Sequence, residues 1–293
     1  MKISELIKNS KKPFFSLEFF PPKSQNNWPS FFDCVEKLKA LDPLFASVTY
    51  GAGGSSQDNT LEIAKRIHAM RLEPMVHLTC VGANAKHIND FLHDLQANNI
   101  DNVLALRGDP PRGQEEAYIE LQKNSKFCYA EDLVRYVRRV APSMGIAVAG
   151  YPSPHPQSPS YALDRIYTLS KIRAGAEFVV TQVFFDVREY FAFVDDLRQS
   201  NINVPVLPGV LPIQSFSSLK TILSMSDARI PGKLYIALEE ADRLGGEEAV
   251  REVGLNFAIE QARSLIEGGA PGIHLYTLNK ADLCLRIAEA VQK

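Results

Sequence analysis

Short apolar strands alternate with amphipathic helices along nearly the whole chain, and this alternation constrains the fold more than any other feature. Segments rich in β-branched and aromatic residues between turn residues predict strands: Phe14–Phe20, Phe45–Thr49, Met75–Thr79, Asn102–Leu106, Ile146–Gly150, Phe178–Val183, Val204–Pro208 and Gly272–Tyr276. Apolar residues at helical spacing predict the segments between them as helices: Trp28–Leu41, Asp58–Met70, Ala85–Asn98, Ala130–Val140, Tyr161–Ala174, Tyr190–Leu197, Phe216–Ser224, Lys233–Arg243 and Leu255–Ile266. Strands that are joined by helices indicate a parallel sheet.

The number and spacing of these units favour an α/β fold of the (β/α)8 TIM-barrel type. Eight units in 293 residues give about 37 residues each, which suits a barrel. Polar residues also follow the strands at their carboxyl ends, where a barrel gathers them on one rim: Glu18, Thr49, His77, Arg107, Asp109, Tyr151, Gln182, Tyr276 and Thr277. A doubly wound open sheet would spread them along an edge and is the alternative. Because no linker interrupts the chain, we expect residues 1–293 to form a single catalytic domain.

Composition and charge narrow the classes of function. The net charge is −2 and charged residues make up 23% of the chain, which does not indicate a nucleic-acid partner. No apolar stretch is long enough to cross a membrane, and no signal peptide is recognisable. The four cysteines lie far apart, without the spacing of a metal site or a disulfide framework. We expect a cytoplasmic homo-oligomeric enzyme with a small-molecule substrate, no metal, and no membrane or nucleic-acid partner.

The first strand carries one carboxylate, Glu18, within an aromatic segment that ends at two prolines. Alternation along a strand places Glu18 on the same face as Ser16 and Phe20. Apolar surroundings disfavour the charged form of a carboxyl group, so we expect the pKa of Glu18 to be raised, as a general acid requires. The alternative is a glutamate at a strand end that faces water or a lysine.

Two further segments hold polar side chains on a stiff backbone. Arg107 and Asp109 flank Gly108 just before two prolines. An arginine suits a phosphate or carboxylate, and an aspartate can stabilise positive charge, although the pair could also form a salt bridge at a turn. Tyr151 and His155 lie in a proline-rich loop with few backbone donors, a composition that is also typical of a PPII-like surface turn.

Two polar residues lie within apolar strands. His77 is either a core histidine with satisfied hydrogen bonds or a functional residue. Gln182 is expected to be buried, so its amide needs a partner. That partner is either the backbone or the edge of a heterocyclic ligand.

Eight short segments, in this order and spacing, resemble the methylenetetrahydrofolate reductase family in its bacterial, single-domain form. They are FSLEFFPPK, SVTYGAGGS, HLTC, LRGDPP, YPSPHP, TQVFFD, PGVLP with Phe216 beyond it, and HLYTLN, and they extend from about Phe14 to Lys280. The resemblance implies a (β/α)8 barrel that contains FAD. It also implies the reduction of 5,10-methylenetetrahydrofolate to 5-methyltetrahydrofolate with NADH or NADPH.

The resemblance further implies roles for individual residues. Glu18 would be the acid for the folate step, and Asp109 would contact the pterin and affect the flavin. Gln182, Phe216 and Lys280 would bind substrate, with the Phe216 ring packing against nicotinamide and folate in turn. The residues implied to line FAD are Thr49, Tyr50, Ala52, His77, Arg107, Gly108, Asp109, Tyr129, Ala130, Tyr151, His155, Asp164 and Lys171.

Three positions depart from the family pattern. Lys280 stands where relatives carry an arginine, so the positive charge for the glutamate tail of folate is kept but the bidentate fork is lost. Tyr167 and Ser170 stand where relatives often carry Asn and Arg near the FAD. These departures put in question the contacts to the folate tail and to the cofactor phosphates.

The implied reaction has two steps. NAD(P)H reduces the flavin and leaves, and the folate then takes hydride from the flavin while Glu18 assists protonation of N10. A folate- or flavin-binding paralogue without turnover, or a reductase that receives electrons from a partner protein, is the alternative. A lyase or aldolase would need a Schiff-base lysine within a strand, and the predicted strands contain none.

Overall fold

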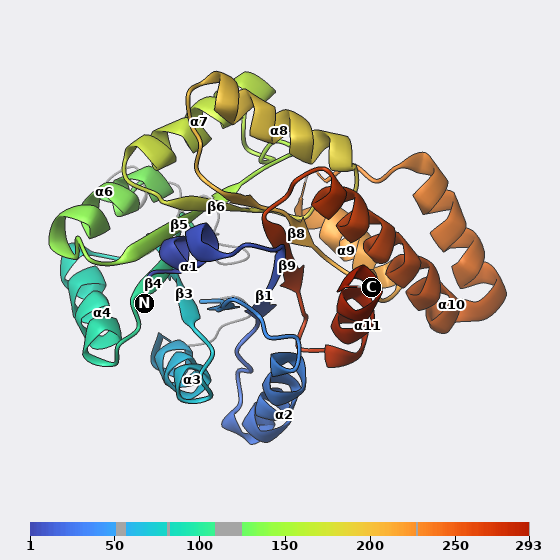
Figure 1. The fold of residues 1–293 in the computed structure, drawn as a ribbon, viewed down its shortest axis with the longest axis horizontal. Helices are drawn as coiled ribbons and strands as arrows, with labels where there is room; N and C mark the ends of the chain where they lie inside the picture. Colours follow the sequence, from blue (N-terminus) through green and yellow to red (C-terminus); the bar gives the residue numbers. More distant parts are fainter. Residues whose placement is uncertain (51–56, 81–82, 109–124, 227, 293) are drawn as a thin grey trace.

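The computed structural model describes residues 1–50, 57–80, 83–108, 125–226 and 228–292. Its strands form one parallel sheet that is rolled into a barrel and surrounded by helices (Figure 1). Around the barrel the strands follow the order β7-β6-β5-β4-β3-β2-β1-β9-β8. Their bounds are β1 (Phe14–Phe19), β2 (Ala46–Val48), β3 (Pro74–Thr79), β4 (Asn102–Leu106), β5 (Gly145–Gly150), β6 (Phe178–Thr181), β7 (Val206–Leu207), β8 (Gly209–Val210) and β9 (Gly272–Tyr276).

The predicted seventh strand closes the barrel in two halves. It is observed as β7 and β8, which are separated only by Pro208. β7 pairs with β6 and β8 pairs with β9, so the two ends of the nine-stranded sheet are consecutive in the chain. Pro208 interrupts the ladder because it has no N–H to donate, but its carbonyl accepts a hydrogen bond from His274 N at 2.9 Å. The predicted eight-unit (β/α)8 barrel is therefore confirmed, and the open sheet is excluded.

Gly209 is required at this closure by space. A Cβ there would lie 2.5 Å from both the carbonyl oxygen of Thr181 and a ring carbon of Tyr276. The Tyr276 ring passes beside the glycine so that its hydroxyl can donate to the Thr181 carbonyl at 2.7 Å. Gly209 therefore lets β9 and β6 be joined across the break in the seventh strand.

Most of the predicted helices are present with small shifts at their ends. The helical elements are α1 (Ile3–Asn9), η1 (Gln25–Asn27), α2 (Trp28–Lys39), α3 (Gln57–Ala69), α4 (Ala85–Ala97), α6 (Ala130–Val140), α7 (Tyr161–Arg173), α8 (Val187–Gln199), α9 (Phe216–Met225), α10 (Gly232–Glu267) and α11 (Ala281–Gln292). The sequence patterns did not predict α1 or α11. They also divided α10 into two shorter helices.

Two glycines within α10 have different roles. Gly246 has φ 62° and ψ −154°, which marks a kink between two helical segments. The second segment nevertheless begins well before the predicted start at Leu255 and contains Gly254. A Cβ at Gly254 would lie 2.5 Å from the Ile213 carbonyl oxygen, so this glycine permits close packing and does not end the helix.

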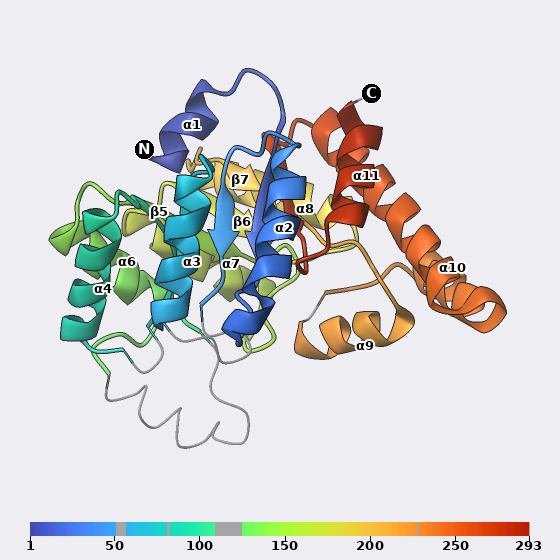
Figure 2. The same ribbon diagram turned by 90° about the horizontal axis from the view of Figure 1, so that it is seen from below.

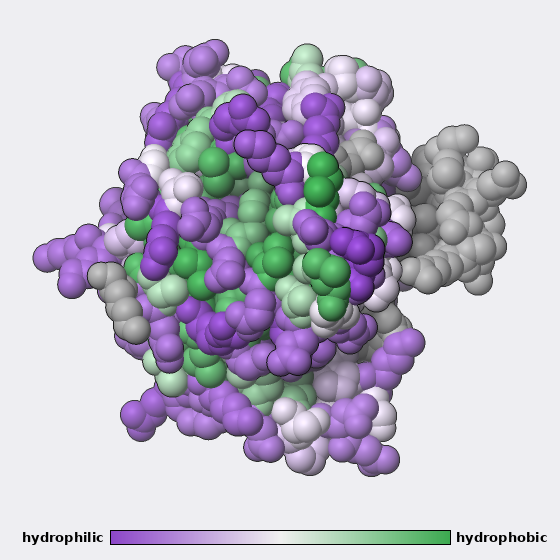
Figure 3. Space-filling view, turned by 90° about the vertical axis from the view of Figure 1, so that its right-hand side faces the viewer, coloured by the Kyte–Doolittle hydropathy of each residue, from purple (hydrophilic) through white to green (hydrophobic). Residues whose placement is uncertain are grey.

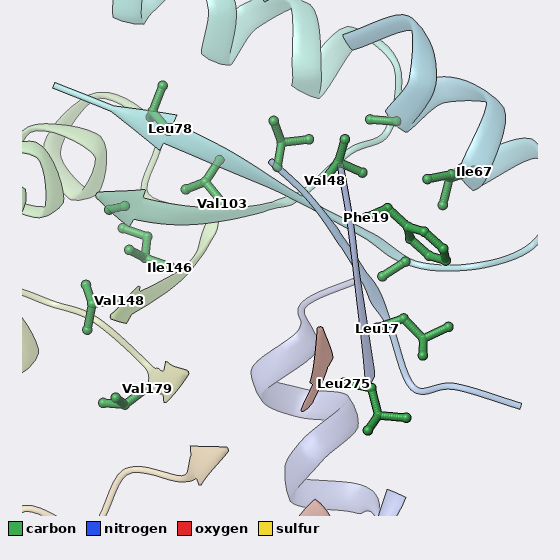
Figure 4. Packing of buried hydrophobic residues seen from close by; sticks show 14 of the residues in the cluster. Leu17, Phe19, Val48, Ile67, Leu78, Val103, Ile146, Val148, Val179 and Leu275 are labelled. Carbon is green, nitrogen blue, oxygen red and sulfur yellow. The ribbon is translucent and has the colours of Figure 1, made fainter. Parts of the chain in front are cut away.

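Two hydrophobic cores lie on opposite sides of the strands. The outer core packs the strands against the helices, and Figure 4 shows Leu17, Phe19, Val48 and Leu275 among its buried side chains. The inner core fills the barrel at the end where the strands begin, and it includes Ile3 and Ile7 of α1. Figure 2 shows α1 at this end of the barrel and α9 at the other. The N-terminal helix thus closes the end opposite to the expected active-site rim.

The alternation predicted for the first strand is confirmed. Phe15, Leu17 and Phe19 belong to the outer core, whereas Ser16 and Glu18 contact side chains of neighbouring strands inside the barrel. The interior therefore changes from apolar at the α1 end to polar toward the carboxyl ends of the strands.

The side of the molecule that carries α10 and α11 is mostly hydrophilic, with apolar side chains gathered near the middle of the face (Figure 3). Ile236 and Leu244 of α10 are exposed. Of the helices that the structure describes, none combines the length and the apolar character needed to cross a bilayer. Among the described residues there is also no group of three or more His, Cys, Asp and Glu side chains that could hold a metal ion.

Candidate active site

Glu18 lies in a buried group of polar side chains, which we call the Glu18 cluster: Glu18, Ser16, Ser47, His77 and His274. The Oε2 atom of Glu18 accepts a hydrogen bond from Ser47 Oγ at 3.2 Å. The same oxygen lies 3.3 Å from His77 Nε2 and 3.5 Å from His274 Nε2. Since Glu18 and His77 are each only 6% exposed and His274 is fully buried, water screens these contacts very little.

The strand register brings this cluster together. Glu18 on β1 is paired with Ser47 on β2, and Ser16 is paired with His274 on β9. Ser16 Oγ lies 2.8 Å from His274 Nδ1, and the Phe45 ring stacks on the imidazole with a centroid distance of 5.8 Å. His274 is thus held by a hydroxyl group on one side and by a ring face, and its Nε2 is directed toward Glu18.

The pKa of Glu18 differs from the sequence-based expectation. Burial raises it, but the His77 and His274 imidazoles beside the carboxylate outweigh burial and lower the pKa from 4.5 to about 2. The prediction of a raised pKa is therefore wrong, because two imidazoles and not only aromatic rings surround the carboxylate. Glu18 is therefore ionised at neutral pH.

The end of β1 is fixed by the segment that follows β9. Thr277 Oγ1 donates to the Glu18 carbonyl at 2.6 Å. Asn279 Nδ2 donates to the Phe20 carbonyl at 2.6 Å, and Asn279 Oδ1 accepts from Phe20 N at 3.0 Å. Leu278 and Asn279 have φ values of 47° and 56°, so the chain turns sharply there and leaves Lys280 exposed just beyond. The HLYTLN segment therefore positions Glu18 as well as carrying the predicted tail-binding lysine.

The segment after β4 begins as predicted with a sharp exit. Gly108 has φ 86°, a conformation that favours glycine. Arg107 Nε donates to the Gly108 carbonyl at 3.2 Å, and its guanidinium also donates to the side chain of Gln157 in the loop after β5. Arg107 thus connects two neighbouring loops on the rim. Its predicted companion Asp109 lies outside the described residues.

The loop after β5 brings together four of the residues predicted to line a cofactor. The rings of Tyr151 and His155 lie 5.0 Å apart at 83°. His155 N donates to Asp164 Oδ1 at 3.1 Å, and burial raises the pKa of this carboxyl group. Lys171 Nζ donates to the Ala149 carbonyl at 2.6 Å and lies 5.6 Å from the Tyr151 ring, and burial lowers the pKa of Lys171 to about 8.

Other predicted cofactor residues border the same end of the barrel. Thr49 is buried at the end of β2, and the Tyr50 ring lies 6.4 Å from the Phe91 ring of α4. Tyr129 is exposed immediately before Ala130, which begins α6. Ala52 lies outside the described residues.

Two predicted substrate residues have surroundings that differ from expectation. Gln182 is exposed and not buried, and its Oε1 accepts from Val183 N at 2.9 Å. Phe216 is 7% exposed at the start of α9, where it packs against Tyr235 of α10 with a centroid distance of 5.4 Å. It belongs to a third hydrophobic core between α9 and α10, which is separate from the Glu18 cluster.

Sequence reasoning missed several residues that shape this region. His274 lies two residues before Tyr276 on β9 and therefore on the same face of the strand, which could have placed it inside the barrel with Ser16. Ser47 could have been found in the same way from β2. Nothing in the sequence indicated that Arg165 of α7 would donate to the carbonyls of Tyr151 and Pro152, at 2.7 and 3.1 Å.

Three buried polar atoms in this region lack a hydrogen-bond partner among the described residues. They are Thr49 Oγ1, His77 Nε2 and Asp164 Oδ2. His77 Nε2 is close to Glu18 but does not meet it with hydrogen-bond geometry. Since buried polar groups are normally satisfied, the arrangement fits a polar ligand that extends over the carboxyl ends of β2, β3 and β5.

Comparison with known proteins identifies the family. The sequence profile of methylenetetrahydrofolate reductase matches residues 2–292. The chain belongs to the methylenetetrahydrofolate reductase family. It is 34% identical to 5,10-methylenetetrahydrofolate reductase of Salmonella typhimurium, over 94% of this chain and 90% of that protein.

Two further proteins are similar in sequence or in fold. The chain is 38% identical to methylenetetrahydrofolate reductase (NADH) 1 of Arabidopsis thaliana, over 95% of its length, but it spans only 49% of that plant protein. A protein from Clostridium thermocellum that binds two copies of 5-methyl-5,6,7,8-tetrahydrofolic acid has the same fold. Its TM-score is 0.69 at 15% identity, over 99% of this chain and 98% of that protein. The family resemblance inferred from the eight segments is thus confirmed.

Proposed function

We propose that this chain reduces 5,10-methylenetetrahydrofolate to 5-methyltetrahydrofolate with NADH or NADPH, using FAD as its cofactor. The observation that carries the proposal is the Glu18 cluster, which puts a carboxylate between two imidazoles inside a barrel of this reductase family. One relative is named for NADH and another for NADPH, so the proposal includes both nucleotides.

The described residues fit a flavin dinucleotide at the carboxyl ends of β2 to β5. Thr49 Oγ1 and Asp164 Oδ2 are buried polar atoms that ligand hydroxyl or N–H groups would satisfy. Arg107 and Lys171 supply positive charge suited to phosphate groups on the same side of the barrel. When bound, FAD would supply the hydride transfer, while the chain supplies orientation and a proton.

The Glu18 cluster is suited to deliver that proton. Opening the five-membered ring of the folate requires a proton on N10. In the open site Glu18 is ionised because its carboxylate is paired with imidazoles. Covering the rim with the aromatic ring of a substrate would remove water and favour the neutral forms of a buried pair. Transfer of a proton from His77 to Glu18 over their 3.3 Å separation would leave both groups neutral. The protonated Glu18 could then donate that proton to N10.

Four other residues have proposed roles that rest on the family resemblance. Asp109 would stabilise the cation that forms when the folate ring opens. Lys280, exposed beyond β9, would attract the glutamate tail. Gln182 would use its exposed amide to bind the folate, and Phe216 would stack on the nicotinamide and folate rings only if it left its packed position against Tyr235.

Steady-state turnover tests the proposal directly. Purified chain supplied with FAD should oxidise NADH or NADPH only when 5,10-methylenetetrahydrofolate is present, and 5-methyltetrahydrofolate should accumulate in equal amount. Anaerobic conditions exclude oxidation by oxygen. Nucleotide oxidation that does not depend on the folate, or no 5-methyltetrahydrofolate by mass spectrometry, would refute the proposed reaction.

A further inference from the structure

Arg165 is a buried arginine on α7 with no part in the proposed chemistry. It is 9% exposed, and its guanidinium lies 4.5 Å from the centroid of the Phe193 ring on α8. Its Nε donates to Asp196 Oδ2 at 2.9 Å, and its two terminal nitrogens donate to the carbonyls of Tyr151 and Pro152 at 2.7 and 3.1 Å. One rigid group therefore connects α7, α8 and the loop after β5.

The sequence of this loop explains why it needs an external donor. Pro152, Pro154 and Pro156 have no N–H, so the loop has few donors with which to form its own turn hydrogen bonds. A buried carbonyl without a partner is destabilising. Arg165 satisfies two successive carbonyls at once, which fixes the orientation of the peptide between Tyr151 and Pro152.

That peptide determines the position of the neighbouring rings. The Tyr151 ring contacts His155 and lies 5.6 Å from Lys171 Nζ. The amide of His155 is held by Asp164, the residue next to Arg165 on α7. One turn of α7 thus anchors both ends of the segment that carries Tyr151 and His155.

We propose that Arg165 is a positioning residue that holds Tyr151 and His155 in the arrangement that binds the cofactor, an inference that rests on the proposed function. Arg165 acts through the loop and through Asp164, whose Oδ2 lies 3.6 Å from its Nη1, while its Nε donates to Asp196 of α8. Its role depends on the shape of the guanidinium as well as on charge, because three acceptors in different directions must be reached from one plane. A lysine has a single nitrogen and cannot reach all three.

Arg138 provides a matched control on the neighbouring helix α6. Its guanidinium donates to the carbonyls of Met144 and Gly175 at 2.9 and 2.7 Å and to Glu177 Oε1 at 2.9 Å. Glu177 also accepts from Ser4 of α1, so this network lies at the closed end of the barrel. Arg138→Lys therefore removes a similar set of hydrogen bonds far from the rim.

The experiment compares Arg165→Lys and Arg138→Lys in the full chain. The probe is FAD, whose dissociation constant from each apoprotein is measured by equilibrium dialysis, with the thermal unfolding midpoint recorded for both. Arg165→Lys should raise the dissociation constant for FAD by about tenfold or more, whereas Arg138→Lys should change it by less than about twofold even where it lowers the unfolding midpoint. At saturating FAD, the Arg165→Lys variant should recover most of its kcat, because no reacting group has been removed. Equal FAD affinity in Arg165→Lys and the parent chain would overturn the proposal.

Hydrogen exchange distinguishes failure of this inference from failure of the proposed function. In the absence of FAD, the amides of Ser153, His155, Gln157 and Ser158 should exchange faster in Arg165→Lys than in the parent chain and in Arg138→Lys. Unchanged exchange would overturn the positioning role whether or not the chain binds flavin. Faster exchange together with a parent chain that binds no FAD would instead refute the proposed function and, with it, the cofactor-binding purpose of the loop.

Discussion

Replacing Glu18 with glutamine should separate the two halves of the proposed reaction. Reduction of the flavin by NAD(P)H needs no proton from a carboxyl group, so its rate should change by only a small factor. Reoxidation by 5,10-methylenetetrahydrofolate needs a proton on N10. Glutamine keeps the shape of Glu18 but cannot take a proton from His77, whose Nε2 lies 3.3 Å from the carboxylate.

The expected loss follows from the usual worth of a positioned acid. General acid catalysis contributes ~10²–10⁴-fold, or roughly 3–5 kcal/mol in the activation free energy. The folate half-reaction of Glu18→Gln should slow by that range. The fold should survive, because glutamine has nearly the same shape as glutamate and keeps an oxygen that can accept the hydrogen bond from Ser47 Oγ.

Anaerobic stopped-flow absorbance measures the two half-reactions separately. Glu177→Gln is the matched control, since Glu177 is a partly buried carboxylate that is bonded to Lys2 and Arg138 at the closed end of the barrel. It should leave both rates near those of the parent chain. If Glu18→Gln slowed both halves equally, Glu18 would be a structural residue of the rim; if it slowed neither, the proton would come from elsewhere, and the proposed role of the cluster would be refuted.

Three further predictions concern stability and substrate binding. The fall in the Glu18 pKa from 4.5 to about 2 corresponds to about 3 kcal/mol of unfolding free energy that is present above pH 4.5 and lost as pH falls toward 2. The free energy of unfolding, measured in urea, should therefore fall more steeply between pH 5 and 3 for the parent chain than for Glu18→Gln. An equal fall in the two proteins would contradict the lowered pKa. Lys280→Ala should raise the KM for methylenetetrahydrofolate, more so for polyglutamates, with little change in kcat, because the charge acts on the tail and not at the reacting carbons; a fall in kcat at constant KM would argue against tail binding. Asp109→Asn should keep FAD but slow the folate half-reaction, and normal folate turnover would leave Asp109 as a turn residue only.

The fold could be predicted to a large extent because its determinants are local. Strand and helix periodicity identified the eight units, and the position of polar residues at strand ends favoured the barrel over an open sheet. The errors occur where tertiary packing overrides a local signal. The sequence patterns began a second helix only at Leu255, yet the structure continues α10 through Gly254, where the Ile213 carbonyl oxygen leaves no room for a Cβ. The seventh strand was predicted as one segment, but it is divided at Pro208 because its first half pairs with β6 and its second half pairs with β9.

The candidate site could be predicted less completely because its chemistry depends on contacts between distant segments. The alternation along β1 correctly directed Glu18 into the barrel, but its pKa is set partly by His274, whose partner Ser16 is 258 residues away in the sequence. The local composition around Glu18 indicated apolar surroundings and hence a raised pKa, which is the wrong direction for the shift. Gln182 was expected to be buried from its apolar neighbours, but it follows the last residue of β6, where the chain reaches the surface.

The visible absorbance of the flavin tests the central claim most directly. The chain is reconstituted with FAD, freed of excess cofactor and kept without oxygen. NADH or NADPH should bleach the flavin band, and 5,10-methylenetetrahydrofolate added after removal of the nucleotide should restore it with one equivalent of 5-methyltetrahydrofolate. A protein that retains no FAD, or a reduced flavin that only oxygen reoxidises, would contradict the account.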